Sequence, residues 1–155
     1  SLLALLERTF KSGRGLPPEI IEWPVRSPQD LVLFEKFRQA LRFETSRLGF
    51  LVRLETFVGL DQAIAIADGI ALAPSLLTRA GEIAKSCAVA GKPLWLYAQE
   101  ANALLEAASS AMSHTPNVVL ALENTNVSRL LHQTRWVVAQ PWVQEAKLPI
   151  HIVAP

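Results

Sequence analysis

The sequence has few charged residues and almost no cysteine, and each shortage excludes a class of protein. Only 19% of the 155 residues are charged and the formal net charge is +1. This composition gives no electrostatic basis for binding nucleic acid or an anionic membrane. Cys87 is the single cysteine, so no disulfide can form within the chain. That usage is typical of a reducing compartment, and we expect a cytoplasmic protein in which Cys87 is a small core residue.

The sequence also lacks an apolar run that approaches the roughly 20 residues of a membrane-spanning helix. It opens with LLALLERTF after Ser1, without the basic start or the small-residue cleavage site of a signal peptide. Because the chain starts without Met and stops abruptly at Pro155, we expect a domain that is excised from, or part of, a longer chain.

The residues that are present indicate a well-packed α/β domain. Half of them are apolar, so we expect the faces of the strands to be buried rather than solvated. A chain of this length suits one domain with a sizeable core, and we assign residues 1–155 to a single α/β domain.

Short apolar runs alternate with stretches of helical periodicity, which predicts a mostly parallel sheet covered by helices. The expected strands are Glu19–Val25, Leu48–Glu55, Asp68–Ala73, Pro93–Ala98, Val118–Leu122, Trp136–Ala139 and Ile150–Val153. The expected helices are Leu2–Phe10, a helix from Pro28 to about Thr45, Gly59–Ala67, Leu76–Ala90, Gln99–Ser113 and a short helix capped by Thr125 or Asn126 that ends at His132.

Seven strands of this kind fit two architectures. A full eight-unit barrel needs at least roughly 200 residues, so we expect alternating βα units in a partial TIM-barrel-like sheet. The alternative is a doubly wound, flavodoxin-like three-layer sandwich. Strand order separates the two, because sequential neighbours indicate a barrel and a reversal indicates a doubly wound sheet.

Four stretches in order carry a resemblance to a known family. They read WPVRSPQDL, LVRLETFVGLDQAIAIADGIALA, AGKPLWLYAQ and NVVLALENTN. Together, over residues 19–126, they resemble the second half of the pyruvate kinase barrel. More distantly they resemble the phosphoenolpyruvate- and pyruvate-binding barrels that include citrate lyase and HpcH-type aldolases.

The resemblance implies roles for two residues of the second expected strand. Where pyruvate kinase has Lys-x-Glu at a strand end, this chain has Arg53 and Glu55. The glutamate would bind a divalent metal, and the arginine would hold the anionic group but could not donate a proton at neutral pH. The family's second metal-binding carboxylate is replaced by Ser75-Leu76, so the expected metal site is incomplete.

The resemblance also aligns two later strand ends. The Thr-Gln of the family corresponds to Ala98-Gln99, and its Gly-Glu-Thr corresponds to Glu123-Asn124-Thr125, where only the threonine is kept. These positions lie at the carboxyl edge of the expected sheet, where parallel α/β proteins bind ligands.

The candidate site residues follow from these positions. Arg53 and Glu55 are the candidate catalytic residues, since they lie two apart on a strand and share a face; Glu55 is the candidate metal ligand. Gln99, Glu123 and Thr125 are the candidate ligand-binding residues. Simpler interpretations remain open: an ion pair for the first two residues, and helix capping for Glu123-Asn124-Thr125-Asn126.

The favoured functional interpretation is a pseudoenzyme: a non-catalytic, pyruvate-kinase-like domain that acts as a binding, regulatory or assembly module. The alternative is a magnesium-dependent enzyme acting on a phosphoenolpyruvate- or pyruvate-like substrate, with the missing parts supplied by another chain. Magnesium is expected only under this alternative. An incomplete barrel leaves apolar strands to be covered, so we expect a homo-oligomer or a covering protein domain as partner. A small anionic metabolite is a further candidate, and neither nucleic acid nor membrane is expected.

Overall fold

The strands pair in the order in which they occur along the chain. The computed structural model describes residues 19–40 and 48–154. Its six strands form one sheet, and all five pairings are parallel. The sequential order confirms the partial barrel and excludes the doubly wound alternative. The strands are β1 (Glu19–Val25), β2 (Leu48–Leu54), β3 (Gly69–Leu72), β4 (Leu94–Ala98), β5 (Val118–Glu123) and β6 (Ile150–Val153).

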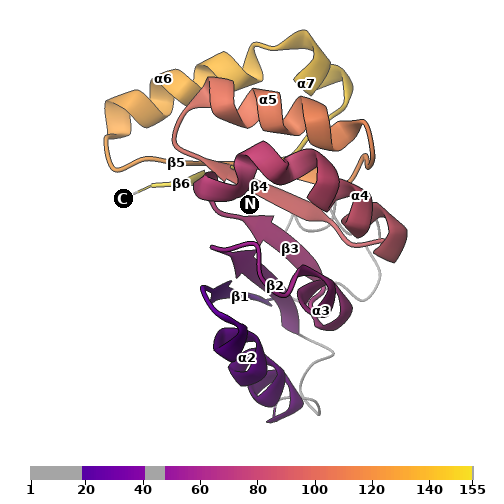
Figure 1. Cartoon of the computed structure of the whole chain (residues 1–155). Coiled ribbons are helices and arrows are strands. Elements are labelled where there is room, and N and C mark those ends of the chain that lie inside the picture. The colour runs from indigo at the N-terminus through magenta and orange to yellow at the C-terminus, as the bar shows by residue number, and fades with distance from the viewer. Residues whose placement is uncertain (1–18, 41–47, 155) are drawn as a thin grey trace.

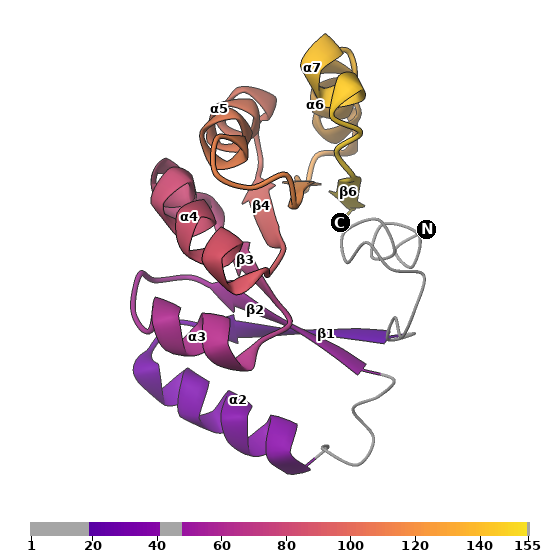
Figure 2. The same ribbon diagram turned by 90° about the vertical axis from the view of Figure 1, so that its right-hand side faces the viewer.

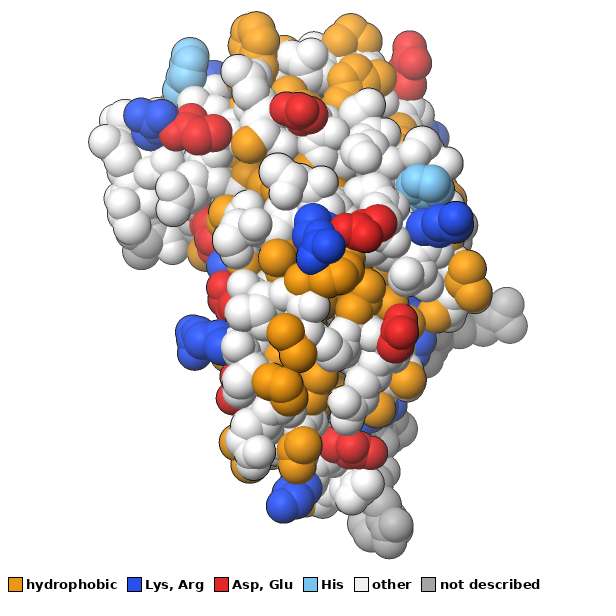
Figure 3. Space-filling model, in the orientation of Figure 1, with side chains coloured by type: hydrophobic (Ala, Val, Ile, Leu, Met, Phe, Trp, Pro, Cys, Tyr) orange, Lys and Arg blue, Asp and Glu red, His pale blue; other side chains and the backbone are white. Residues whose placement is uncertain are grey.

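Helices connect the strands and cover one face of the sheet (Figure 1). After a quarter turn they form an arc around the outside of the curled strands (Figure 2). Acidic and basic side chains are interspersed on this helical surface (Figure 3). The helices are α2 (Pro28–Ala40), α3 (Leu60–Ile66), α4 (Ala80–Ala90), α5 (Ala101–Met112), α6 (Val127–Val138) and α7 (Pro141–Glu145), with a 3₁₀ helix, η2 (Pro74–Arg79), before α4.

Each strand contributes to two apolar clusters, one on each face of the sheet. Outward-facing residues such as Val52 and Ile70 pack with the helices in the larger cluster. The inner, concave face carries a smaller cluster of six buried residues: Leu51, Ala71, Trp95, Tyr97, Val119 and Ala121. Strands buried on both faces read as continuous apolar runs, as in the wholly buried β4 sequence LWLYA.

Several element boundaries follow from local signals in the sequence. The Asp30 carboxylate accepts hydrogen bonds from the backbone N–H groups of Arg26 and Ser27 at 2.7 and 3.2 Å, as expected of the acid in a capping box. Gly91 ends α4 in the left-handed conformation (φ 68°). Asn126 caps α6 by accepting the backbone N–H of Arg129.

The predicted strand Trp136–Ala139 is wrong, because residues through Val138 belong to α6. The β-favouring run Trp-Val-Val is overridden by helical periodicity: Leu130 and Val137, two turns apart, are both buried. Trp136 is 52% exposed rather than part of the core. The described chain therefore has six strands where the sequence predicted seven.

Two predicted segments lie outside the described residues: the helix Leu2–Phe10 and the end of the helix that was expected to reach Thr45. In the part of the chain that the structure describes, no helix is both long and apolar enough to cross a membrane.

Gly59 and Gly91 have the same left-handed backbone conformation but different surroundings, so alanine variants of the two distinguish backbone strain from steric overlap. Alanine at Gly91 would meet no atom within 4 Å, so Gly91→Ala should lower the free energy of unfolding by about 1 kcal/mol, the cost of a left-handed residue. Alanine at Gly59 (φ 74°) would overlap the buried Leu31 side chain. Gly59→Ala should therefore cost roughly 1–3 kcal/mol more. Urea unfolding of both variants measures the difference, and equal costs would contradict the packing of α2 against α3.

Candidate functional site

A group of polar side chains on the concave face is centred on Arg53. Arg53 is the penultimate residue of β2, and its partners come from three other places in the sheet and from the end of β2 itself. We call these five residues the Arg53 cluster: Glu22 on β1, Arg53, Glu55 just beyond β2, Tyr97 on β4 and Glu123 at the end of β5. It lies at the carboxyl edge of the strands, where barrel enzymes carry their active sites.

The guanidinium of Arg53 donates from all three of its nitrogens to glutamates. Its Nη1 and Nη2 bind the two carboxylate oxygens of Glu123 at 3.2 and 3.0 Å, and its Nε binds Glu55 at 3.1 Å. Its Nη1 also lies 4.0 Å from Glu22. The guanidinium carbon stacks 4.5 Å from the centre of the Tyr97 ring. The arginine is therefore held by two-pronged pairing, a second carboxylate and an aromatic face.

The contact between Arg53 and Glu123 depends on the curvature of the sheet. The two residues belong to strands three positions apart, which in a flat sheet would be separated by about 14 Å. Curling brings the inward-facing side chains of β2 and β5 within hydrogen-bonding distance. Ala71, which is the register partner of Arg53 on β3, is small enough to leave room for the arginine to cross.

The electrostatics of the cluster are dominated by carboxylates, three against one guanidinium. Burial alone would lower the pKa of Arg53, but its hydrogen bond to Glu123 and the charges of Glu123, Glu55 and Glu22 raise it overall. Burial raises the pKa of Glu22, and the neighbouring Glu123 and Glu55 add to the rise, against the opposing effects of Arg53 and Tyr97. Burial also raises the pKa of Tyr97, with a contribution from Glu22.

The residues present do not fit a magnesium site at Glu55. A magnesium ion takes oxygen ligands at near-octahedral geometry, with carboxylates that are free to coordinate it. Here Glu55 already accepts the Arg53 Nε–H, and the same guanidinium lies between Glu55 and Glu123. Within residues 19–40 and 48–154, no group of three His, Cys, Asp or Glu side chains is arranged to hold a metal ion.

The three predicted ligand-binding residues do come together. Gln99, Glu123 and Thr125 line a hollow of about 270 Å³ with Asn124 and two residues at the end of β6. Much of its polar surface is already engaged: Glu123 pairs with Arg53, and the Asn124 side chain donates to the Gln99 carbonyl and accepts the Asn126 N–H. A ligand-binding role for these residues stays a prediction.

The sequence patterns do not identify Glu22 or Tyr97 as site residues. A signal was present for Glu22, since it interrupts the apolar strand EIIEWPV with an acid. Its neighbour across the pairing is Leu51, which shares a face with Arg53. Tyr97 is indeed buried, but its hydroxyl donates to Glu22 at 3.4 Å and its ring supports Arg53.

No protein-family model and no curated protein matches this sequence. Two solved structures from Thermotoga maritima share its fold. A truncated form of 3-deoxy-D-arabino-heptulosonate 7-phosphate synthase matches 90% of this chain, with a TM-score of 0.53 and 12% identity. A phospho-2-dehydro-3-deoxyheptonate aldolase (DAHP synthase) matches 99% of it, with a TM-score of 0.59 and 13% identity.

The chain spans only 64% and 55% of the lengths of these two proteins. At such low identity the likeness shows the fold alone. It supports the barrel-type α/β fold that the sequence predicted, and it does not point to pyruvate kinase in particular.

Because the pKa of Glu22 is raised, removing its charge should stabilise the fold in a pH-dependent way. A carboxyl whose pKa is higher in the folded state stabilises the fold only when protonated, and this contribution is lost as the pH rises above its ordinary value of 4.5. Glu22→Gln should therefore be more stable than the unmodified chain at pH 7, and the difference should vanish below pH 4.5.

Urea unfolding at a series of pH values measures this difference. The matched control is Glu106→Gln, which neutralises an exposed glutamate on α5. It should show no comparable gain at pH 7. A Glu22→Gln chain that is less stable than the unmodified chain at pH 7 would show that Glu22 acts there mainly as an ion-pair partner of Arg53.

Proposed function

We propose that this chain is a non-catalytic module on a barrel-type scaffold, and that it acts by binding in a regulatory or assembly role. The proposal rests on one observation: the guanidinium of Arg53 is already bound to glutamates of the same chain. Its Nε, Nη1 and Nη2 all donate to the carboxylates of Glu55 and Glu123. In this proposal Arg53 is a structural group that holds the curled sheet, and not a receptor for substrate.

The geometry of anion recognition supports this proposal. An arginine that binds phosphate or carboxylate presents its forked N–H groups to the ligand. In this chain the fork is filled by Glu123, so an incoming anion would have to displace that carboxylate. It would also enter the field of Glu22 and Glu55, which repel it.

The charge balance opposes phosphoryl transfer for a related reason. That reaction depends on positive groups placed around the transferring phosphoryl group. The Arg53 cluster supplies one cation and three carboxylates, and the described residues do not assemble a magnesium site beside it. The residues that resemble a phosphoenolpyruvate site are thus arranged to pair with one another.

An assembly role is supported by exposed apolar side chains on α6. Val127, Leu131 and Val138 are 64%, 50% and 45% exposed, and their spacing of four and seven residues places them on one side of the helix. The partner predicted from the sequence, a second copy or a covering domain, remains part of the proposal.

One observation favours the alternative function, a magnesium-dependent enzyme. Arg53, Glu55 and Glu123 lie at the carboxyl edge of parallel strands, the position of the active site in barrel enzymes. Under this alternative, Glu123 would release Arg53 for the anionic substrate and Glu55 would turn to magnesium.

Thermal shift with phosphoenolpyruvate and with oxalate, each with and without magnesium, separates the two functions. A ligand that binds only the folded state raises the melting temperature once it exceeds its dissociation constant. We expect no shift for the unmodified chain. The Glu55→Gln, Glu123→Gln double variant frees the Arg53 fork, so we expect a shift with oxalate that does not need magnesium.

The contrary result is a magnesium-dependent shift in the unmodified chain that is lost in Glu55→Ala and kept in the surface variant Glu106→Gln. That result would establish Glu55 as a metal ligand and would overturn the non-catalytic proposal.

A further inference from the structure

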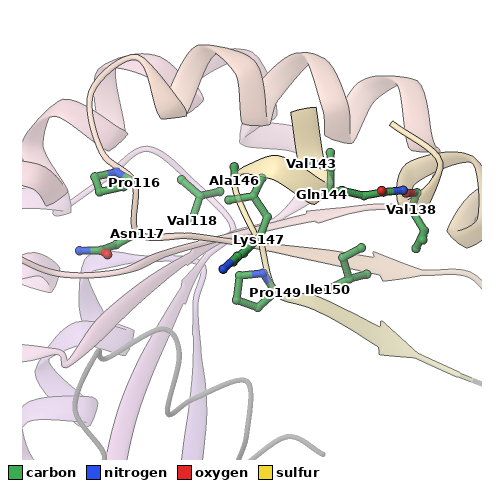
Figure 4. A pocket seen from close by; sticks show the side chains of 11 residues that line it. Pro116, Asn117, Val118, Val138, Val143, Gln144, Ala146, Lys147, Pro149 and Ile150 are labelled. Carbon is green, nitrogen blue, oxygen red and sulfur yellow. The ribbon is translucent and has the colours of Figure 1, made fainter. Parts of the chain in front are cut away.

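A larger cavity lies at the opposite, amino-terminal end of the last two strands. Its volume is about 730 Å³, and it is formed by the starts of β5 and β6, the end of α6, and α7 with the loop that follows it (Figure 4). Its walls are mainly apolar and include Val118, Val138, Val143 and Ile150. A volume of this size is within the range of small-molecule sites, roughly 300–1,000 Å³.

Three polar residues line this cavity: Asn117, Gln144 and Lys147. In the view of Figure 4 the Lys147 amino group lies near Pro149, and the Asn117 amide points away from it. Among the described residues, the Lys147 ammonium has no ion-pair partner and the Asn117 side chain makes no hydrogen bond. By contrast, the Gln144 side chain is engaged, since it donates to the Val138 carbonyl at 2.6 Å and joins α7 to α6.

Lys147 also has an unusual backbone conformation. Lys147 is the one non-glycine residue with a positive φ (53°) in the part of the chain that the structure describes. It closes α7: its N–H bonds to the Gln144 carbonyl, and the Leu148 N–H bonds to the Val143 carbonyl. Glycine usually occupies this position because a side chain there is strained. A lysine held against that strain points to a function for its ammonium group.

We propose that this cavity binds a small amphipathic carboxylate. The apolar body of the ligand lies against Val118, Val138, Val143 and Ile150, and its carboxylate pairs with the Lys147 ammonium. A cation next to apolar walls selects an anionic head group on an apolar body. The site is at the end of the strands opposite the Arg53 cluster, so this proposal does not depend on the non-catalytic assignment.

Two probes with the same apolar body and opposite charge test the proposal on the whole chain. Octanoate should raise the melting temperature and give a saturable isotherm in calorimetric titration, whereas octylamine should do neither. Lys147→Gln should weaken octanoate binding about tenfold, the effect of losing a charge-assisted hydrogen bond. Lys85→Gln, an exposed lysine on α4, is the matched control and should bind octanoate as the unmodified chain does.

Two further variants separate the charge from the backbone and locate the site. Lys147→Gly should raise the melting temperature of the free protein by relieving the strained backbone, and should weaken octanoate binding as much as Lys147→Gln does. Val138→Trp should fill the cavity and remove octanoate binding while keeping Lys147. The absence of any octanoate shift, an equal shift with octylamine, or unchanged binding in Lys147→Gln or Val138→Trp would each overturn the proposal.

Discussion

The pairing of Arg53 with Glu123 is the interaction on which the concave face of this protein depends. It joins strands that are three positions apart in the sheet, and the residues are 70 positions apart in the sequence. The contact requires a curled sheet, and once formed it favours that curvature over a flatter one. The four charged side chains of the cluster are 19–37% exposed, so water screens each pair in part. The stabilisation therefore comes from the network and from the two-pronged geometry rather than from any single ion pair.

The same interaction argues against the catalysis that the position of these residues in the fold would suggest. The cluster stands where barrel enzymes carry out catalysis, yet its cation is neutralised by the chain itself and its carboxylates are in excess. One scaffold supports many functions, so position in the barrel is not enough to assign an activity. At the other end of the strands, Lys147 lines an apolar cavity and has no ion-pair partner among the described residues. The two ends of the sheet are thus suited to different tasks, one to holding the sheet and one to receiving a ligand.

Much of the fold could be predicted from the sequence, because the spacing of apolar residues and the residues that end helices and strands are local features. Glu19–Val25 and Ile150–Val153 were predicted with the bounds that the structure shows, and the shared face of Arg53 and Glu55 follows from the period of a strand. The strand at Trp136 failed because burial of Val137 in α6 outweighed local β propensity. The partners of Arg53 on β1 and β5 depend on how far the sheet curls, which no local pattern encodes. The left-handed backbone conformation of Lys147 could not be predicted either, since lysine does not favour that conformation.

The central claim, that Arg53 is held by the chain's own glutamates, can be tested most directly by nuclear magnetic resonance of its guanidinium group. The N–H signals of Arg53 can be assigned by their loss in Arg53→Lys and compared with those of the exposed Arg135. If the guanidinium is held as described, its Nη1 and Nη2 groups rotate slowly, give separate signals and exchange slowly with water, and Glu123→Gln removes these properties. A single averaged Nη signal with fast exchange, like that of Arg135, would contradict the claim and leave Arg53 free to bind a substrate.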